Sequence, residues 1–140
     1  MNSLVRKFRR LMLLAEAFVL SIAAAAAVAF VPFKRIAAWS SRQPPPQRVP
    51  ADPLPAVRRV RWAVRLWAKV VPWRSMCFEQ ALSAQWMLRR RGVATTLFYG
   101  VAKDPEKGFI AHTWVKSGDR PVVGCENASD FTELARFPAA

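Results

Sequence analysis

The chain has 140 residues and a formal net charge of +13, from 22 Lys+Arg against 9 Asp+Glu. This length has room for one domain with a core of ordinary size. Two cysteines are too few for a disulfide scaffold, and one histidine without a CxxC pair argues against a zinc site. The few glycines are scattered, which argues against a phosphate-binding loop. We therefore expect no metal and no other cofactor.

The positive charge is concentrated in the first two thirds of the chain. Residues 1–91 hold 17 Lys+Arg and 3 Asp+Glu, a balance of +14, whereas residues 92–140 hold 5 and 6, a balance of −1. A basic half of this kind predicts an anionic partner, which could be nucleic acid, an acidic membrane surface, or an acidic protein or peptide.

The chain begins with a basic segment up to Arg10, followed by an apolar stretch from Leu11 to Phe33 that is interrupted by Glu16. This pattern fits a signal peptide or a membrane span. Glu16 argues against both, because an acid at the centre of a span costs about 2.5–3.5 kcal/mol. We therefore treat residues 1–42 as an apolar and basic helical segment, with membrane association through residues 11–33 as an open alternative.

Residues 43–55 contain six prolines and predict a surface linker. Residues 56–71 then show the apolar periodicity of a helix. Five cations occupy most of its remaining surface, and they form either a solvated face or a docking surface: Arg58, Arg59, Arg61, Arg65 and Lys69.

A second helix is predicted from Met76 to about Arg91, with Ser75 as its N-cap and Gly92 ending it. Strand-like runs follow at Val93–Val101, at Phe109–Lys116 and through Pro121–Val123, separated by turn residues. This order predicts an α+β fold with a papain-like layout. The catalytic helix would pack on a small antiparallel sheet, residues 56–140 would form the core, and N-terminal helices would precede it.

Cys77 and His112 are the candidate catalytic residues. Cys77 falls in the first turn of its helix, where unpaired N–H groups and the helix dipole favour a thiolate. His112 lies on a strand, where it shares a face with Ile110 and Trp114. An ionised thiol and an imidazole that takes and returns a proton are the requirements of thiol catalysis. The residues alone do not separate this from a buried cysteine beside an ordinary histidine, nor hydrolysis from transamidation.

Separated stretches around these two residues follow one another in a characteristic order: Pro72–Cys77, Gln80–Leu82, Met87–Val93, Gly100–Lys103, Ala111–Val115 and Phe131–Phe137. In this order they resemble the transglutaminase-like half of the lasso-peptide B proteins. The resemblance implies a cysteine protease that removes the leader from a ribosomally made precursor peptide, with Cys77 as nucleophile and His112 as base.

The same resemblance implies a cytoplasmic protein whose N-terminal helix packs on the catalytic domain or on a partner. This chain contains no segment for the leader-recognition domain of the fused members, so it corresponds to the split form. Its partners would be the precursor peptide, a separate leader-binding protein and, further along the pathway, the lasso cyclase.

The position of the family's usual acid, twelve residues after His112, falls on Gly124. The resemblance therefore assigns no third catalytic residue. A three-residue loop of Gly118–Arg120 would place Glu126 opposite His112, and we take Glu126 as the third member. A two-residue Gly118–Asp119 loop would instead pair His112 with Cys125 and bring in Asn127. Asp119 in the turn and Asp130 are the other candidates.

The oxyanion would be held by the Cys77 amide, with Gln80 and Trp114 as further oxyanion or substrate contacts. Two other functions stay open at this stage: a non-catalytic basic adaptor, and a nucleic-acid-binding module, which no recognisable reading motif supports.

Overall fold

The computed structural model describes residues 2–42, 50–70 and 77–138. Four helices precede a four-stranded antiparallel sheet, which confirms the predicted α+β class. The helices are α1 (Ser3–Phe30), α2 (Phe33–Ser40), α3 (Leu54–Val70) and α4 (Cys77–Arg90). The strands are β1 (Thr96–Asp104), β2 (Gly108–Ser117), β3 (Arg120–Val123) and β4 (Thr132–Phe137), with the 3-10 helix η2 (Ala128–Asp130) before β4.

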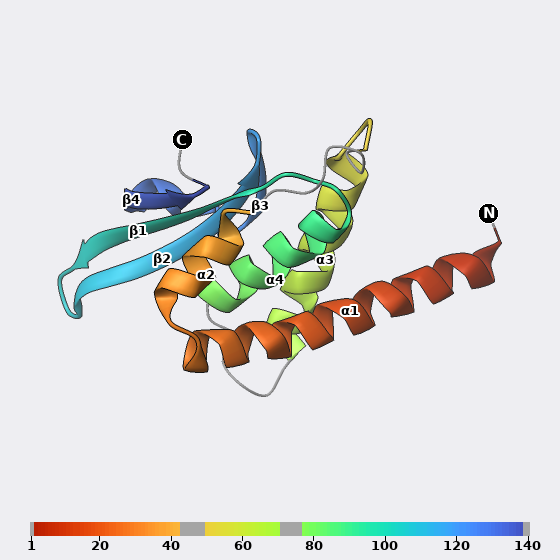
Figure 1. Cartoon of the computed structure of the whole chain (residues 1–140), viewed down its shortest axis with the longest axis horizontal. Helices are drawn as coiled ribbons and strands as arrows, with labels where there is room; N and C mark the ends of the chain where they lie inside the picture. The colour runs from red at the N-terminus through yellow and green to blue at the C-terminus, as the bar shows by residue number, and fades with distance from the viewer. Residues whose placement is uncertain (1, 43–49, 71–76, 139–140) are drawn as a thin grey trace.

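The sheet has the order β3-β2-β1-β4, and the helices cover one of its faces (Figure 1). The predicted β1–β2 hairpin is present, with Asp104 paired to Gly108 at its turn. Strand β4 was not predicted from residue pattern. It pairs with β1, but its first three residues are exposed and its burial does not alternate, so the period-two signal of a half-buried strand is missing.

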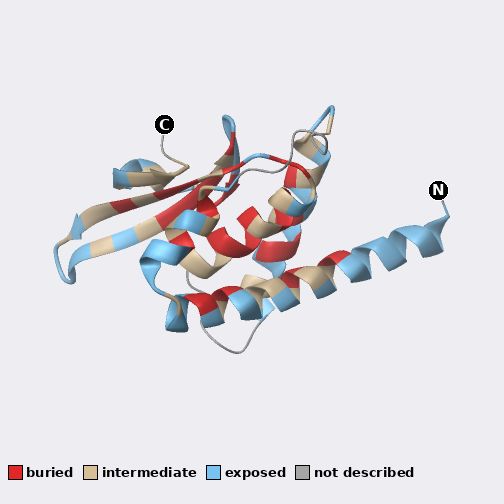
Figure 2. Cartoon of the chain, in the orientation of Figure 1, coloured by how far each residue is buried: buried red, intermediate tan, exposed pale blue. Residues whose placement is uncertain are grey.

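Helix α4 is the centre of the molecule. It lies between the sheet on one side and helices α1 and α3 on the other, and half of its residues are buried (Figure 2). Leu82 and Leu88 belong to one core cluster with Val115 of β2 and Val122 of β3. Full burial of each such side chain contributes about 1.5–3 kcal/mol, so this packing holds the start of α4 at a defined place beside the sheet.

Helix α1 packs on α3 and α4 through a narrow stripe that includes Leu13, Ala17, Ala24 and Ala27. The small alanine side chains let the helix backbones approach closely. The N-terminal end of α1 projects beyond the rest of the molecule and is exposed (Figures 1 and 2). Within the described residues, α1 alone has the length and apolar composition of a membrane-spanning helix, and 17% of its most apolar window is buried in the fold.

The helix ends show where sequence signals determined local structure. Helix α3 begins at Leu54, two residues before the predicted start, because Asp52 accepts a hydrogen bond from the Leu54 N–H at 3.1 Å and Pro55 is tolerated in a first turn. Gly92 ends α4 as predicted, with a φ of 77° and a Val93 N–H to Leu88 carbonyl bond of 2.9 Å. The predicted N-cap Ser75 lies outside the described residues.

Candidate active site

Cys77 is the first residue of α4 and is half-buried. Ala81, Ala84 and Leu88, which follow it on the predicted stripe of the helix, are fully buried. This burial anchors α4 and therefore fixes the position of its first turn. The thiol consequently lies at the N-terminal, positive end of a three-to-four-turn helix.

His112 comes from the middle of β2, where it pairs with Gly100 of β1. Its side chain and that of Cys77 line one cavity of about 250 Å³. Gln80 of α4 and Asn127, which follows β3, line the same cavity. The structure therefore brings together a helix-start cysteine and a strand-borne histidine that are 35 residues apart in the sequence.

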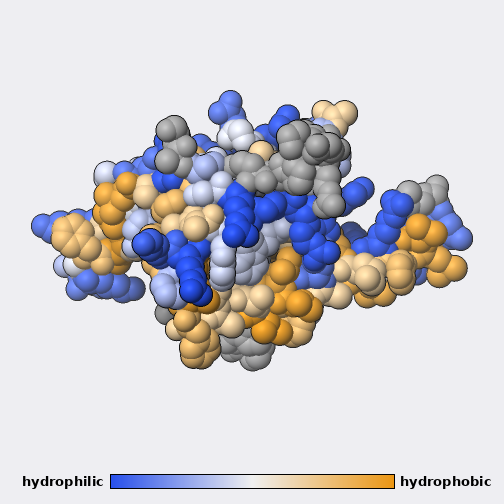
Figure 3. Space-filling model, viewed as in Figure 1, coloured by the Kyte–Doolittle hydropathy of each residue, from blue (hydrophilic) through white to orange (hydrophobic). Residues whose placement is uncertain are grey.

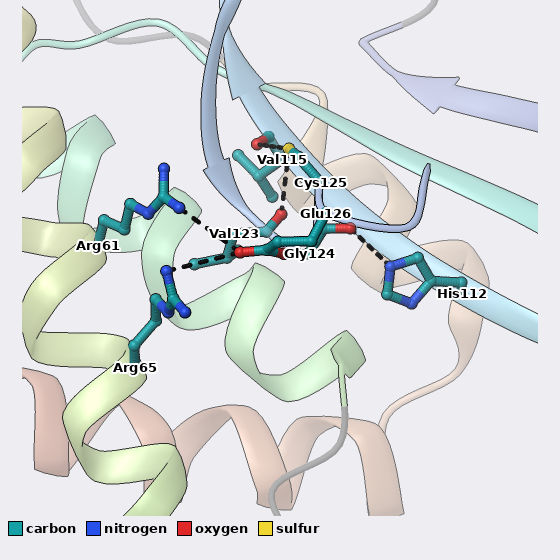
Figure 4. A network of polar contacts seen from close by, with 8 residues as sticks. All are labelled: Arg61, Arg65, His112, Val115, Val123, Gly124, Cys125 and Glu126. Carbon is teal, nitrogen blue, oxygen red and sulfur yellow. Dashed lines mark hydrogen bonds and ion pairs between the residues drawn. The ribbon is translucent and has the colours of Figure 1, made fainter. Parts of the chain in front are cut away.

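The imidazole of His112 is held by a main-chain oxygen. Its Nε2 lies 2.7 Å from the Gly124 carbonyl oxygen (Figure 4). A carbonyl can only accept a hydrogen bond, so Nε2 carries the hydrogen in this contact. In the neutral ring, Nδ1 then has the free lone pair and is the nitrogen that can accept the thiol proton.

Aromatic side chains fix the plane of the same ring. Trp114 stacks beside His112 with ring centroids 5.8 Å apart, and Phe131 lies 4.9 Å away. Trp114 itself stacks on Phe98 of the neighbouring strand at 5.6 Å and is buried. Gly100 leaves room for this indole, because a Cβ there would lie 3.0 Å from it. Trp114 is not among the cavity-lining residues, so the structure shows it supporting the histidine and shows no contact with the space for substrate.

The path of the chain after β3 explains why Gly124 meets the histidine. The β2–β3 turn is the two-residue Gly118–Asp119 loop, since Ser117 pairs with Arg120. A bulge then shifts the register by one residue, so that Val115 pairs with Val123, where β3 ends. Neither predicted pairing of His112, with Glu126 or with Cys125, is formed, because the ladder stops before it reaches either residue.

Gly124 turns the chain out of the ladder in a conformation that favours glycine. Its φ is 73°, and a Cβ built on it would lie 2.7 Å from the Thr113 carbonyl oxygen. The position where the resembling family has its acid therefore cannot hold a side chain in this backbone. The sequence indicated position 124, but it did not indicate that the main-chain carbonyl of this residue contacts His112. Residue identity does not reveal where a main-chain carbonyl points.

Glu126 lines the cavity, but its carboxylate faces the cations of α3. Oε1 lies 3.5 Å from Arg61 Nη2 and 3.5 Å from Arg65 Nη1 (Figure 4). All three side chains are at least 36% exposed, so these pairs contribute little to stability. They do close one side of the cavity, since Arg65 also lines it. A catalytic role for Glu126 stays a prediction.

The remaining candidates divide by position. Asn127 and Gln80 both line the cavity together with His112. Gln80 lies in α4, three residues after Cys77. Asp119 lies in the β2–β3 turn and Asp130 in η2, and neither is among the residues that line the cavity. Within the described residues, no group of three His, Cys, Asp or Glu side chains could hold a metal ion.

The second cysteine, Cys125, is half-buried like Cys77, but it is not among the described residues that line the cavity. Cys125 follows Gly124, and its thiol donates to the Val115 carbonyl at 3.3 Å. Burial raises the pKa of the Cys125 thiol above its usual value, so it stays protonated at neutral pH. It is therefore a structural thiol, and Cys77 is the candidate nucleophile.

A half-buried cysteine at a helix start, facing a cavity shared with a positioned histidine on an antiparallel sheet, defines the cysteine-dependent class of papain and transglutaminase-like folds. Comparison with protein families matches residues 18–136 to the transglutaminase-like superfamily, and the chain belongs to that superfamily. Membership points to hydrolase chemistry that depends on a cysteine. Neither the curated proteins nor the solved structures include a match to this chain.

Proposed function

We propose that this protein is a leader peptidase of lasso-peptide biosynthesis, a cysteine protease that cuts the leader from a ribosomally made precursor. The observation that carries the chemistry is the shared cavity of Cys77 and His112, with the imidazole positioned through Nε2. The observation that favours the biological role is the ordered set of stretches from Pro72 to Phe137 that resembles the lasso-peptide B proteins.

The proposed reaction uses groups on α4 and β2. Nδ1 of His112 takes the proton of the Cys77 thiol, and the thiolate attacks the carbonyl carbon of the scissile peptide bond. The oxyanion accepts hydrogen bonds at the helix start, from the Cys77 amide and from the Gln80 side chain. When the intermediate collapses, the C–N bond breaks and His112 returns its proton to the leaving amine. Water, activated by the same imidazole, then releases the acyl group as a carboxylic acid.

Recognition of the leader is assigned to a separate protein. The two described N-terminal helices pack into one core with α3 and α4, so they do not form a leader-binding module of their own. The proposal therefore includes a leader-binding partner, the precursor peptide as substrate, and the lasso cyclase as the enzyme that uses the product.

The proposal places the protein in the cytoplasm, with α1 packed on the domain. Glu16, within the apolar stretch, accepts a hydrogen bond from Arg91 at 2.9 Å and is only 14% exposed. A helix that crossed a bilayer would have to give up this ion pair and its packing on α4. Recovery of the full-length protein in the membrane fraction after a high-salt wash would contradict this placement.

The test uses the purified protein, a candidate precursor peptide, and the product of a neighbouring gene as the leader-binding partner. Mass spectrometry should show leader release by the wild type, accelerated by the partner. Cys77→Ala and His112→Ala should abolish release, and Cys125→Ala should retain it. Release by the Cys77→Ala protein, with contaminating proteases excluded, would end the peptidase proposal.

A further inference from the structure

A second concave surface lies apart from the cavity of Cys77. It is a hollow of about 1330 Å³ between the N-terminal half of α1, the N-terminal half of α3 and the end of α4. In the space-filling view, hydrophilic side chains gather on both sides of the gap between the projecting end of α1 and the rest of the molecule (Figure 3). We call this surface the basic groove.

The walls of the basic groove are cationic on all three helices. Helix α1 contributes four of these side chains: Arg6, Lys7, Arg9 and Arg10. Helix α3 contributes Arg58 and Arg59, and the end of α4 contributes Arg90 and Arg91. Among the described residues that line the groove, Glu16 is the only acid, and it is already paired with Arg90 and Arg91.

Apart from Arg90 and Arg91, these cations have no acidic partner among the described residues. Like charges held around one hollow repel one another, which destabilises the compact state until counter-charge arrives. The groove is therefore complementary to a ligand that carries several negative charges.

The floor of the groove is apolar. Phe8, Met12 and Val19 of α1 are each more than half exposed, and Trp62 of α3 is 38% exposed. Exposed large apolar side chains bordered by polar ones are typical of an interaction site. An occupant must therefore offer an apolar face together with its negative charges.

We propose that the basic groove binds an acidic amphipathic helix of another protein. Such a helix would place its apolar stripe on Phe8, Met12 and Trp62 and its carboxylates against the arginines of the walls. The proposal is independent of the peptidase assignment, because the residues that line the groove and those that line the cavity of Cys77 do not overlap.

Other occupants fit less well. A second copy of this chain would bring a further formal charge of +13 to a basic surface. Single-stranded nucleic acid is held by a row of aromatic faces, and among the described residues that line the groove only Phe8 and Trp62 are aromatic. A flat bilayer surface would contact only the rim of this concave hollow of about 1330 Å³ and leave its interior unfilled.

The test measures fluorescence anisotropy of a labelled synthetic helix of about five turns, with leucines along one face and glutamates elsewhere. Binding should exceed that of a scrambled peptide of the same composition. Arg58→Glu combined with Arg59→Glu should weaken it more than about tenfold, because like charges across an interface are strongly unfavourable. Lys103→Glu combined with Lys107→Glu, exposed positions on the β1–β2 hairpin, changes the net charge equally and should change binding less than about twofold.

Trp62→Ala examines the floor separately and should weaken the patterned peptide several-fold without affecting the scrambled one. Arg58→Ala combined with Arg59→Ala replaces the charge reversals if those fail to fold by circular dichroism. Equal binding of the scrambled peptide, or equal loss in the hairpin variant, would overturn the proposal. So would tighter, Arg58- and Arg59-dependent binding of duplex DNA or of phosphatidylserine vesicles.

Discussion

The group that orients His112 is a neutral carbonyl oxygen. A carboxylate in its place would form a stronger hydrogen bond with the ring once the ring is charged. A carboxylate would add the attraction of an opposite charge, so the Gly124 carbonyl stabilises the imidazolium less than an acid would. The contact still defines the tautomer. Stacking of Trp114 and the nearby ring of Phe131 then define the plane of the ring, so its orientation does not depend on one bond.

Restoring an acid at position 124 should damage the site. Gly124→Asp and Gly124→Ala both put a Cβ 2.7 Å from the Thr113 carbonyl oxygen and force a left-handed φ on a residue with a side chain. We expect a loss of about 1–3 kcal/mol in the free energy of unfolding, measured by urea denaturation, and a large loss of leader cleavage.

Gly118→Ala is the matched control for this prediction. Gly118 also has a positive φ, of 60°, but a Cβ there meets no atom within 4 Å. It should lower stability less and leave cleavage unchanged. Higher activity in Gly124→Asp than in the wild type would show that the histidine partner has been assigned to the wrong group.

The two cysteines should differ in reactivity. Cys77 lies at a helix start beside an imidazole, whereas burial raises the pKa of Cys125 and its S–H donates to the Val115 carbonyl. Iodoacetamide at neutral pH should therefore modify the native protein at Cys77 at least several-fold faster than at Cys125. Peptide mapping by mass spectrometry gives both rates in one sample. Similar rates at the two sites would argue for a non-catalytic adaptor.

At the scale of elements, the placement of α1 depends on a few polar contacts as much as on its alanines. Glu16 meets Arg91 and Arg90 at the end of α4, and the Trp67 indole N–H of α3 donates to the Leu14 carbonyl at 2.8 Å. Glu16, which argues against a membrane span in the sequence, thus joins α1 to the helix that carries Cys77.

Replacing this acid should loosen α1. Glu16→Gln keeps the size of the side chain and removes its charge, so we expect a loss of about 1–3 kcal/mol in the free energy of unfolding. Glu133→Gln is the control, because its pair with Arg136 is exposed, and it should cause no measurable change. Thermal denaturation of both variants provides the comparison. Equal effects would mean that the Glu16 contact is no stronger than a surface ion pair.

At the scale of the whole molecule, the N-terminal helices complete the core of the catalytic region. The Gln85 side chain is fully buried and donates to the Ser40 carbonyl of α2 at 2.9 Å, and Arg89 donates to the Trp39 carbonyl. Both donors belong to α4. The proposed division into residues 1–42, 43–55 and 56–140 is therefore open to a direct experiment.

Deletion of residues 1–42 should abolish cooperative folding. The truncated chain would expose the apolar face of α3 and α4 and leave the donors of Gln85 and Arg89 without their acceptors. Circular dichroism melts and limited proteolysis should show no cooperative transition. Deletion of residues 1–10 alone, of which residues 2–10 are exposed, should leave the melt nearly unchanged. A stable, cooperatively folding 43–140 fragment would contradict this prediction and support an independent core.

The sequence alone determined the features that depend on local chemistry. Hydrophobic periodicity and turn residues predicted α3, α4 and the β1–β2–β3 order, Gly92 marked the end of α4, and Cys77 and His112 stood out by residue type and position. The tertiary structure decided what depends on long-range placement. The β2–β3 bulge, the role of the Gly124 carbonyl, the arginine partners of Glu126 and the packing of α1 all join segments that are distant in sequence or use main-chain atoms. Residue pattern does not encode these, because a one-residue change of register or a backbone oxygen has no signature in side-chain identity.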